Sequence, residues 1–186
     1  LPAALGRARA EVFSEVQALD TGLLDRTPIE AMRALTARLG DGDDTAVAFR
    51  LLAAPAVFTA AVVRAQSGEA PVAPDPTLSH AADILRMLRG TPATKAEADA
   101  LDTYLVTVSD HGLNASTFAA RVVASTRAGL TSAVLAGISA LKGPLHGGAP
   151  GPIIDMLDEI GEPANARAWI EGALARGDRL MGFGHR

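Results

Sequence analysis

Three of the four histidines in the chain lie beside glycine, in places where the helical pattern of the sequence stops. They are His111 in DHGLN, His146 in PLHGGAP and His185 in GFGHR. Glycine permits positive φ and lets a ligand approach the backbone closely, so a histidine beside it can stand at an element end with its ring facing a cleft. The helix predicted after His146 would also direct unpaired N–H groups toward an anionic ligand. We interpret these three histidines as candidate catalytic or binding residues.

The spacing and the surroundings of the histidines also bear on structural, metal-binding and hydrolytic roles. A single histidine in a loop is usually a solvated or hydrogen-bonded side chain, and His80, at the start of a predicted helix, is interpreted as structural. A zinc site usually takes three or four ligands with close spacing, whereas the three histidines lie 35 and 39 residues apart and the chain has no cysteine. The sequence has no G-x-S-x-G turn, and GFGHR follows a helical pattern rather than a strand. Metal, serine-hydrolase and dinucleotide sites are therefore disfavoured.

The composition narrows the class of protein. Of 186 residues, 48% are hydrophobic and 20% are charged, which is enough apolar material for a packed core. Aromatic residues make up only 4%, a balance that favours closely packed helices. The net charge of −4 argues against a nucleic-acid-binding surface. The longest uncharged run, 128–141, is shorter than the ~20 residues that span a bilayer. With no signal-peptide pattern either, we expect a cytoplasmic protein without a membrane partner.

Helix start and stop signals recur along the chain, and strand-like alternation is nearly absent. The predicted fold class is therefore all-α. Thr27 and Glu30 form one capping box, with proline at the first helical position, and Thr94 and Glu97 form another. Apolar residues follow both boxes at helical spacing, so each box predicts the start of a helix.

The central part of the chain contains two further predicted helices. Residues 45–66 have a helical pattern that contains Pro55, so we expect a kink or a break there. The next segment, 67–77, is rich in proline and is predicted to be a loop. Ser79 can then cap a short helix that ends near Gly90.

The last third of the chain is predicted to hold its longest helix, over 115–142. Gly129 and Gly137 lower its helix propensity by roughly 1 kcal/mol each, but they also let another helix approach closely. After the break around His146, two amphipathic helices are predicted over 153–160 and 166–174.

Several longer motifs resemble those of one known family. DHGLNASTFAARVVAST, ALKGPLHGGA and RLMGFGHR occur in the order, and at about the spacing, seen in bacterial-type citrate synthases. The preceding sequence SHAADILRMLRGTPAT is also similar to that family. The resemblance covers nearly all of the chain and is looser over residues 1–70. We therefore expect a citrate synthase-like, multihelical all-α fold.

The resemblance implies a homodimer whose subunits each have two helical domains. Residues 1–145 would form part of the large domain, and residues 146–186 would begin the small domain. Family members are longer than this chain, and beyond the GHR motif they carry a substrate-binding arginine and an aspartate base. The chain also begins at Leu1 rather than Met. We therefore expect it to be part of a longer protein and to be inactive by itself.

The resemblance also implies a reaction, the condensation of acetyl-CoA with oxaloacetate to give citrate and free CoA. His146, as a neutral imidazole, would donate a hydrogen bond to the thioester oxygen while the aspartate takes the methyl proton. His185 would polarise the oxaloacetate carbonyl, and His111 would help to bind oxaloacetate. No metal or separate cofactor is implied, because the CoA thioester is a substrate. The residues that would bind the adenine end of CoA are Arg179, Leu180, Met181, Gly182 and Phe183.

Two departures from the family pattern leave the acyl donor open. Pro150 and Gly151 follow HGGA where asparagine and glutamate are common, and Gly112 stands where glutamate is frequent. Neither departure removes a catalytic side chain. Because 2-methylcitrate synthases share the same motifs, propionyl-CoA is an alternative acyl donor. A helical scaffold that keeps the fold without the chemistry is the alternative from a different class.

Overall fold

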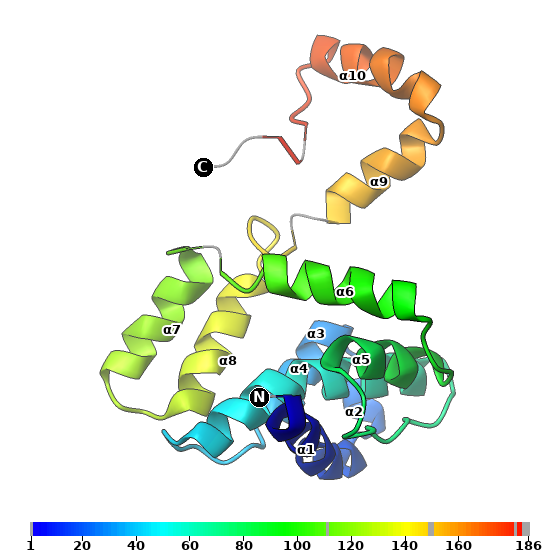
Figure 1. The fold of residues 1–186 in the computed structure, drawn as a ribbon. Coiled ribbons are helices and arrows are strands. Elements are labelled where there is room, and N and C mark those ends of the chain that lie inside the picture. Colours follow the sequence, from blue (N-terminus) through cyan, green and yellow to red (C-terminus); the bar gives the residue numbers. More distant parts are fainter. Residues whose placement is uncertain (1, 111, 149–150, 181, 184–186) are drawn as a thin grey trace. The chain divides into compact units, whose positions relative to one another are not determined.

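The protein is helical throughout the part of the chain that the structure describes (Figure 1). The computed structural model describes residues 2–110, 112–148, 151–180 and 182–183. Within these ranges it contains no strand, which confirms the predicted all-α class. In chain order the elements are α1 (Pro2–Val12), the 3-10 helix η1 (Phe13–Ala18), α2 (Thr21–Leu24), α3 (Pro28–Thr36), α4 (Thr45–Gln66), α5 (His80–Arg89), α6 (Lys95–Thr107), α7 (Ala115–Ser125), α8 (Leu130–Leu141), α9 (Gly151–Ile160), the 3-10 helix η2 (Pro163–Asn165) and α10 (Ala166–Ala175).

The chain divides into two compact units, Leu1–Ser139 and Ala140–Arg186. The first unit holds helices α1 to α7 and most of α8, and the second holds α9 and α10. The domain limits implied by the resemblance, 1–145 and 146–186, remain a prediction.

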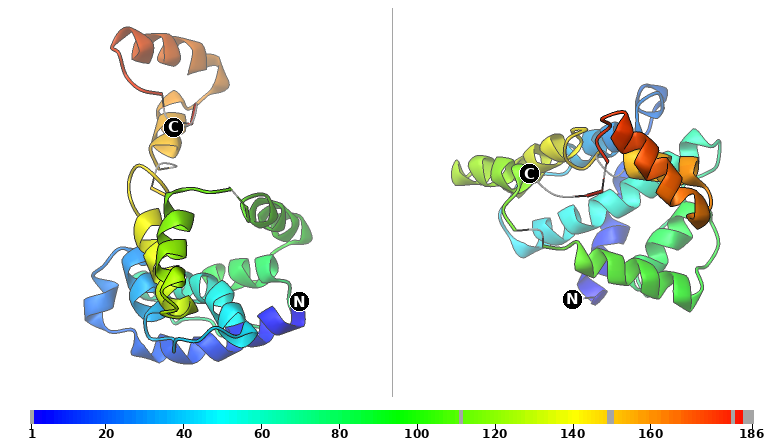
Figure 2. Two further views of the ribbon diagram at one scale, coloured as in Figure 1. Left: turned by 90° about the vertical axis from the view of Figure 1, so that its left-hand side faces the viewer. Right: turned by 90° about the horizontal axis from the view of Figure 1, so that it is seen from above.

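Helix α4 supplies more of the core of the first unit than any other described helix. It packs against α1, α3 and α5, and Figure 2 shows the same neighbours from two further sides. Nine of its 22 residues are buried. Phe58 and Val62 of α4 are completely buried, as is Leu35 of α3. Burying a side chain of this size contributes ~1.5–3 kcal/mol, so the contacts of α4 largely determine the stability of this unit.

The hydropathy of α4 agrees with this central position. By length and composition it is the one helix among the described residues that could cross a membrane, and half of its most apolar window is buried in the protein. A helix that is apolar on all sides is typical of a protein interior as well as of a membrane. Arg50 and Arg64 divide the sequence of α4, so its longest uncharged run is shorter than the helix itself. The contacts with α1, α3 and α5 identify it as a core helix.

Of the kink or break expected at Pro55, the break does not occur, because α4 continues through this residue. Proline in a helix interior removes one backbone N–H donor and costs about 3 kcal/mol. Ala54, directly before the proline, and Val57, two residues after it, are buried in the core at 0% and 1% exposure. Burial on both sides of the proline offsets the local cost, so the helix persists.

The prediction of one long helix over 115–142 is wrong, because this segment forms the two helices α7 and α8. Between them, Arg127 and Gly129 adopt left-handed φ angles of 59° and 103°. A side chain at Gly129 would collide with the carboxylate of Asp41, which lies in the loop between α3 and α4. The turn between α7 and α8 is therefore fixed by a contact with residues that are distant in the sequence.

The predicted helix starts are confirmed by side-chain hydrogen bonds. Glu97 accepts from the N–H and the hydroxyl of Thr94, both at 2.8 Å. Glu30 accepts from the hydroxyl of Thr27 at 2.9 Å. Ser79 caps α5 by accepting a backbone N–H at 3.2 Å. Such caps satisfy donors that the first turn of a helix leaves without partners, so they can be predicted from local sequence.

The second unit contains α9 and α10 at the positions predicted for two amphipathic helices. The indole Nε1 of Trp169 in α10 donates to Glu159 Oε2 in α9 at 3.0 Å. The amide of Asn165, just before α10, donates to the carbonyl oxygen of Ile160 at 3.1 Å. Ala173 is completely buried and Ile160 is 9% exposed. These contacts connect the two helices.

Candidate functional site

His146 lies in a compact turn that follows the end of α8. Its N–H donates to the carbonyl oxygen of Gly143 at 3.0 Å, and the N–H of Gly148 donates to the same oxygen at 3.2 Å. The N–H of Gly147 donates to the carbonyl oxygen of Leu141 at 2.8 Å. The bond to Leu141 satisfies a carbonyl group that the end of a helix leaves without a helical partner. The chain therefore turns back onto the end of α8 at His146.

The tightness of this turn explains the two glycines after His146. A Cβ at Gly147 would collide with the carbonyl oxygen of Leu141 and would lie 2.7 Å from its Cγ. A Cβ at Gly148 would lie 3.1 Å from Pro144 Cα. Neither glycine has positive φ. Glycine is needed here for close packing and not for a left-handed φ. The group that approaches the glycines is the backbone and side chain of the same turn, not a ligand.

The histidine in this turn is half-buried, whereas its neighbour Leu145 is 79% exposed. A half-buried imidazole remains accessible to a small molecule, as the predicted role of His146 requires. His111 and His185 lie outside the described residues. The convergence of the three rings on one pocket therefore remains a prediction.

The residues that flank His111 in the sequence form the start of α7. Asn114 Oδ1 accepts the N–H of Thr117 at 3.0 Å and so caps the helix. The carboxylate of Asp110 accepts the N–H of Gly112 at 2.7 Å. Gly112 has a φ of 65°, a left-handed conformation in which glutamate would be strained. The departure from the family pattern at this position thus suits the local backbone.

The predicted CoA-binding segment follows α10. Gly182, with a φ of 88°, lies against α9, where an added Cβ would be 3.3 Å from Ile153 Cδ1. Phe183 is 65% exposed. Met181 lies outside the described residues. An exposed aromatic ring can stack on an adenine base. The other described members of the segment are an exposed Arg179 and a half-buried Leu180.

Sequence comparison identifies the family. A family model described as citrate synthase, C-terminal domain, matches residues 3–186. The chain belongs to the citrate synthase family. A 2-methylcitrate synthase of Mycobacterium tuberculosis is 41% identical over 167 residues, and a citrate synthase of Deinococcus radiodurans is 41% identical over 169 residues. Each similarity covers 86% of this chain but only 42% and 45%, respectively, of the relative.

Solved citrate synthase structures have the same fold. The citrate synthase of Thermoplasma acidophilum, solved as a ternary complex with carboxymethyl coenzyme A and oxaloacetate, is 31% identical with a TM-score of 0.81. That similarity covers 99% of this chain and 51% of the solved chain. The citrate synthase of Thermotoga maritima is 28% identical with a TM-score of 0.79. The citrate synthase fold expected from the motifs is confirmed, and the chain spans about half the length of these relatives.

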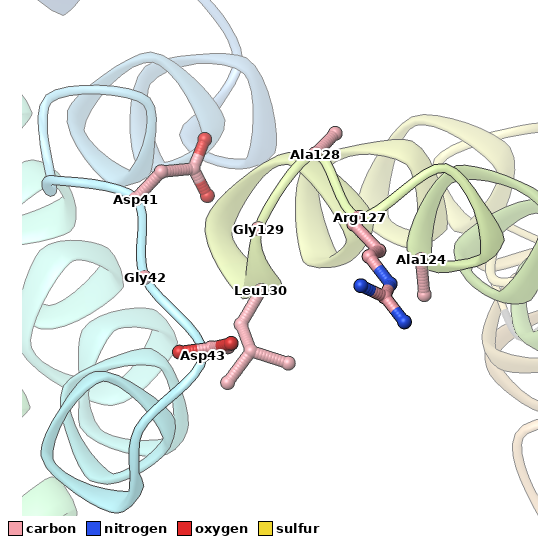
Figure 3. A pocket seen from close by; sticks show the side chains of 8 residues that line it. All are labelled: Asp41, Gly42, Asp43, Ala124, Arg127, Ala128, Gly129 and Leu130. Carbon is pink, nitrogen blue, oxygen red and sulfur yellow. The ribbon is translucent and has the colours of Figure 1, made fainter.

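The first unit also has a surface cavity of about 640 Å³ that the sequence does not indicate (Figure 3). The hydroxyl of Ser132 donates to Asp41 Oδ2 at 2.6 Å, and this bond is the main cause that lowers the pKa of Asp41 below its usual value. Residues 91 positions apart meet here, which no local pattern predicts. His146 does not contribute to the cavity, which is lined by Asp41, Gly42, Asp43, Ala124, Arg127, Ala128, Gly129 and Leu130.

A metal centre would need several ligating side chains close together. Within the described ranges, no group of three or more histidine, aspartate or glutamate side chains is placed so that it could hold a metal ion.

Proposed function

We propose that the full-length protein catalyses the condensation of acetyl-CoA with oxaloacetate to give citrate and free CoA. The observation that carries this proposal is the turn at His146, where a half-buried imidazole is held at the end of α8 by backbone bonds of Gly147 and Gly148. This turn lies within the sequence that the citrate synthase family model spans. Because the chain spans about half of its relatives, the proposal concerns the protein as a whole.

The first chemical step is the removal of a proton from the methyl carbon of acetyl-CoA. Negative charge then develops on the thioester oxygen, and a donor aimed at that oxygen lowers the barrier. His146 is this donor in our proposal, and the base is an aspartate outside the present chain. A positioned acid or base typically contributes ~10²–10⁴-fold to the rate, so both groups are required.

The enol carbon then attacks the ketone carbon of oxaloacetate, and the ketone oxygen takes up a proton as the carbon–carbon bond forms. His185 polarises this carbonyl, and His111 helps to hold oxaloacetate. Water finally cleaves the thioester of citryl-CoA, which gives a carboxylate and the CoA thiol. The ligands of the Thermoplasma acidophilum structure support these two substrates. The segment from Arg179 to Phe183 binds the adenine end of CoA in this proposal.

A second candidate function is the 2-methylcitrate synthase reaction, with propionyl-CoA as the acyl donor. A specific observation favours it, because the relative with that name is as similar to this chain as the Deinococcus radiodurans citrate synthase is. The two reactions differ by one methylene group on the acyl donor. A hydrophobic pocket distinguishes such donors by only ~1–3 kcal/mol, so a direct comparison of the two donors is needed.

A homodimer and a cytoplasmic location complete the proposal. Association is supported by large apolar side chains of α6 and α7 that are at least half exposed: Tyr104 at 61%, Val106 at 66%, Phe118 at 63% and Val122 at 50%. Large apolar groups left exposed on consecutive helices can form part of an interaction surface. The cytoplasmic location rests on the sequence alone.

The function is tested by following the release of the CoA thiol from the full-length protein with oxaloacetate and either acetyl-CoA or propionyl-CoA. We expect release with at least one donor, and the ratio of the two kcat/KM values identifies the enzyme. Absence of thiol release with both donors would instead support the helical scaffold.

The role of His146 is tested by His146→Ala in the same protein. We expect kcat to fall by about 10²-fold or more because the developing enolate loses its donor, while far-UV circular dichroism stays unchanged. Leu145→Ala is the matched control, since Leu145 lies in the same turn and is 79% exposed. Near wild-type turnover of His146→Ala would contradict the assigned role.

A further inference from the structure

Arg9 and Asp83 form an ion pair inside the first unit, between α1 and α5. Their side chains are 1% and 0% exposed, and Arg9 Nε donates to Asp83 Oδ2 at 2.7 Å. Arg9 Nη2 donates to the carbonyl oxygens of Asp75 and Leu78 at 3.1 and 2.9 Å. A pair removed from water is tolerated only when its hydrogen-bonding groups find such partners. Arg9 therefore fixes the loop that connects α4 to α5, residues 67–79, against α1.

The α4–α5 loop is held by two further contacts. The N–H of Asp75 lies 3.1 Å from both carboxylate oxygens of Asp83. The backbone of Pro76 lies so close to α1 that a Cβ at Gly6 would collide with the Pro76 carbonyl oxygen. The loop thus depends on the same buried carboxylate that pairs with the arginine, and it packs directly on α1.

His80, the first residue of α5, completes this cluster. Its Nδ1 lies 3.3 Å from Arg9 Nη1. A guanidinium group can only donate hydrogen bonds, so Nδ1 must accept and the proton of the neutral ring must be on Nε2. Protonation of Nδ1 would remove the acceptor and would place a second positive charge beside Arg9 in a half-buried position. The cluster is therefore compatible with only one protonation state of His80.

Charged groups from the surrounding elements act on His80 in opposite directions. Burial is the largest cause that lowers the pKa of His80 below its ordinary value of 6.5, and the positive charge of Arg9 adds to it. The carboxylates of Asp83 and Asp102 oppose this shift but do not cancel it. The charged side chains of the cluster and its neighbours are Arg9 from α1, Asp75 from the loop, Asp83 and Arg86 from α5, and Asp102 from α6.

We propose that His80 is an acid-sensitive switch, which holds the α4–α5 loop against α1 while Nδ1 is unprotonated and releases the loop when the ring is protonated. The released or unfolded state binds a proton at its ordinary pKa, whereas the closed state binds it at a lower pKa. The closed loop is therefore fully stabilised above about pH 6.5 and loses stability as the pH falls below that value. Asp75 stays ionised at these pH values, because hydrogen bonds from Thr77 lower its pKa below the usual value of 3.8.

The proposal is tested by amide hydrogen exchange of the α4–α5 loop in the full-length protein between about pH 5 and pH 8, with rates corrected for the intrinsic effect of pH. In the wild type we expect the opened fraction of the loop to rise as the pH falls below about 6.5, by at most about tenfold per pH unit, which is the limit for one proton. His80→Asn is the decisive variant, because its amide oxygen can replace Nδ1 as an acceptor and does not titrate. We expect its loop to show no pH dependence in this range. His146→Gln, which removes a histidine outside the cluster, serves as the control and should show the wild-type profile.

A nuclear magnetic resonance titration of the His80 ring provides a second measurement that needs no variant. We expect the pKa of His80 to lie below 6.5 and its neutral ring to carry the proton on Nε2. A pKa at or above the ordinary value would overturn the proposal. So would loop protection that is independent of pH in the wild type, or that changes equally in His80→Asn.

Discussion

Helices α4 and α6 lie in the same unit, but their apolar side chains have different surroundings. Nine residues of α4 are buried between α1, α3 and α5, whereas α6 and its successor α7 bury none. Tyr104 of α6 and Phe118 of α7 remain more than 60% exposed. The comparison shows that helical periodicity identifies an apolar face without identifying what covers it. Helix α4 is stabilised by burial within its own unit, while α6 and α7 gain less from burial and depend more on their capping residues.

The same substitution in both regions gives the largest expected contrast. Phe58→Ala in α4 removes a side chain at 0% exposure and should lower the free energy of unfolding by about 3–5 kcal/mol. Phe118→Ala in α7 removes one at 63% exposure and should change it by less than about 0.5 kcal/mol. Urea unfolding followed by far-UV circular dichroism measures both. Equal losses of unfolding free energy in the two variants would show that Phe118 is covered in solution. If the loss in Phe118→Ala also depended on protein concentration, the cover would be a second copy of the chain.

The next effect is expected at the buried ion pair. Arg9→Met removes the fully buried one of the two arginines that pair with Asp83 and leaves Arg86, 2.7 Å from the carboxylate, so it should cost about 3 kcal/mol. The double variant Arg9→Met/Asp83→Leu should regain part of this loss, because it also removes the buried negative charge. Lys95→Met is the matched control, since the Lys95–Asp99 pair is 88% and 61% exposed and should contribute less than about 0.5 kcal/mol. A similar loss of unfolding free energy in Arg9→Met and Lys95→Met would show that burial does not decide what an ion pair contributes.

A smaller effect is expected at the start of α6, where no buried side chain supports the helix. Thr94→Ala removes the hydroxyl of the capping box and should cost about 1 kcal/mol. Because the change is local, amide exchange in the first turn of α6 should increase more than exchange in α4. Thr94→Ser, which keeps the hydroxyl, should behave like the wild type, and an equal loss in both variants would argue against the cap.

The smallest expected effect is a pH dependence of the stability of α6. The backbone N–H of Thr94 and the side chain of Arg89 hold the pKa of Glu97 at about 2, well below its ordinary 4.5. Since the folded state binds the proton less tightly, the contribution of Glu97 is complete above about pH 4.5 and is lost as the pH falls toward 2. Carboxyl-carbon NMR of Glu97 checks the pKa, and amide exchange of α6 checks the consequence. Glu97→Gln should abolish this pH dependence. If the pH dependence persisted in this variant, another titrating group would be responsible for it.

Local signals in the sequence located many helix ends. The capping boxes at Thr27 and Thr94 and the cap at Ser79 were predictable because donor and acceptor lie within three residues of each other. The break around His146 was also predictable, because several glycines and prolines are concentrated between residues 143 and 152. The reason for glycine at position 147 was not predictable. The carbonyl oxygen of Leu141 excludes a side chain there, and only the folded turn brings that oxygen near Gly147.

The turn inside 115–142 and the continuity of α4 at Pro55 have long-range causes. The turn in the middle of 115–142 depends on Asp41, which occupies the space beside Gly129. Continuity of α4 at Pro55 depends on burial against three other helices. In each case a contact between distant residues overrides a local preference worth a few kcal/mol. Predictions from a single sequence segment cannot include such contacts.

The sequence by itself determined the all-α class, the positions of most helices, the family and the three candidate histidines. These features depend on residue types within a few positions of one another, or on motifs that stay recognisable without coordinates. Only the tertiary structure decided which apolar faces are buried, and that Arg9 meets Asp83 across 74 residues. The tertiary structure alone also placed His80 against that pair. The physical reason is that burial and charge pairing are properties of the space around a side chain, which the whole folded chain creates.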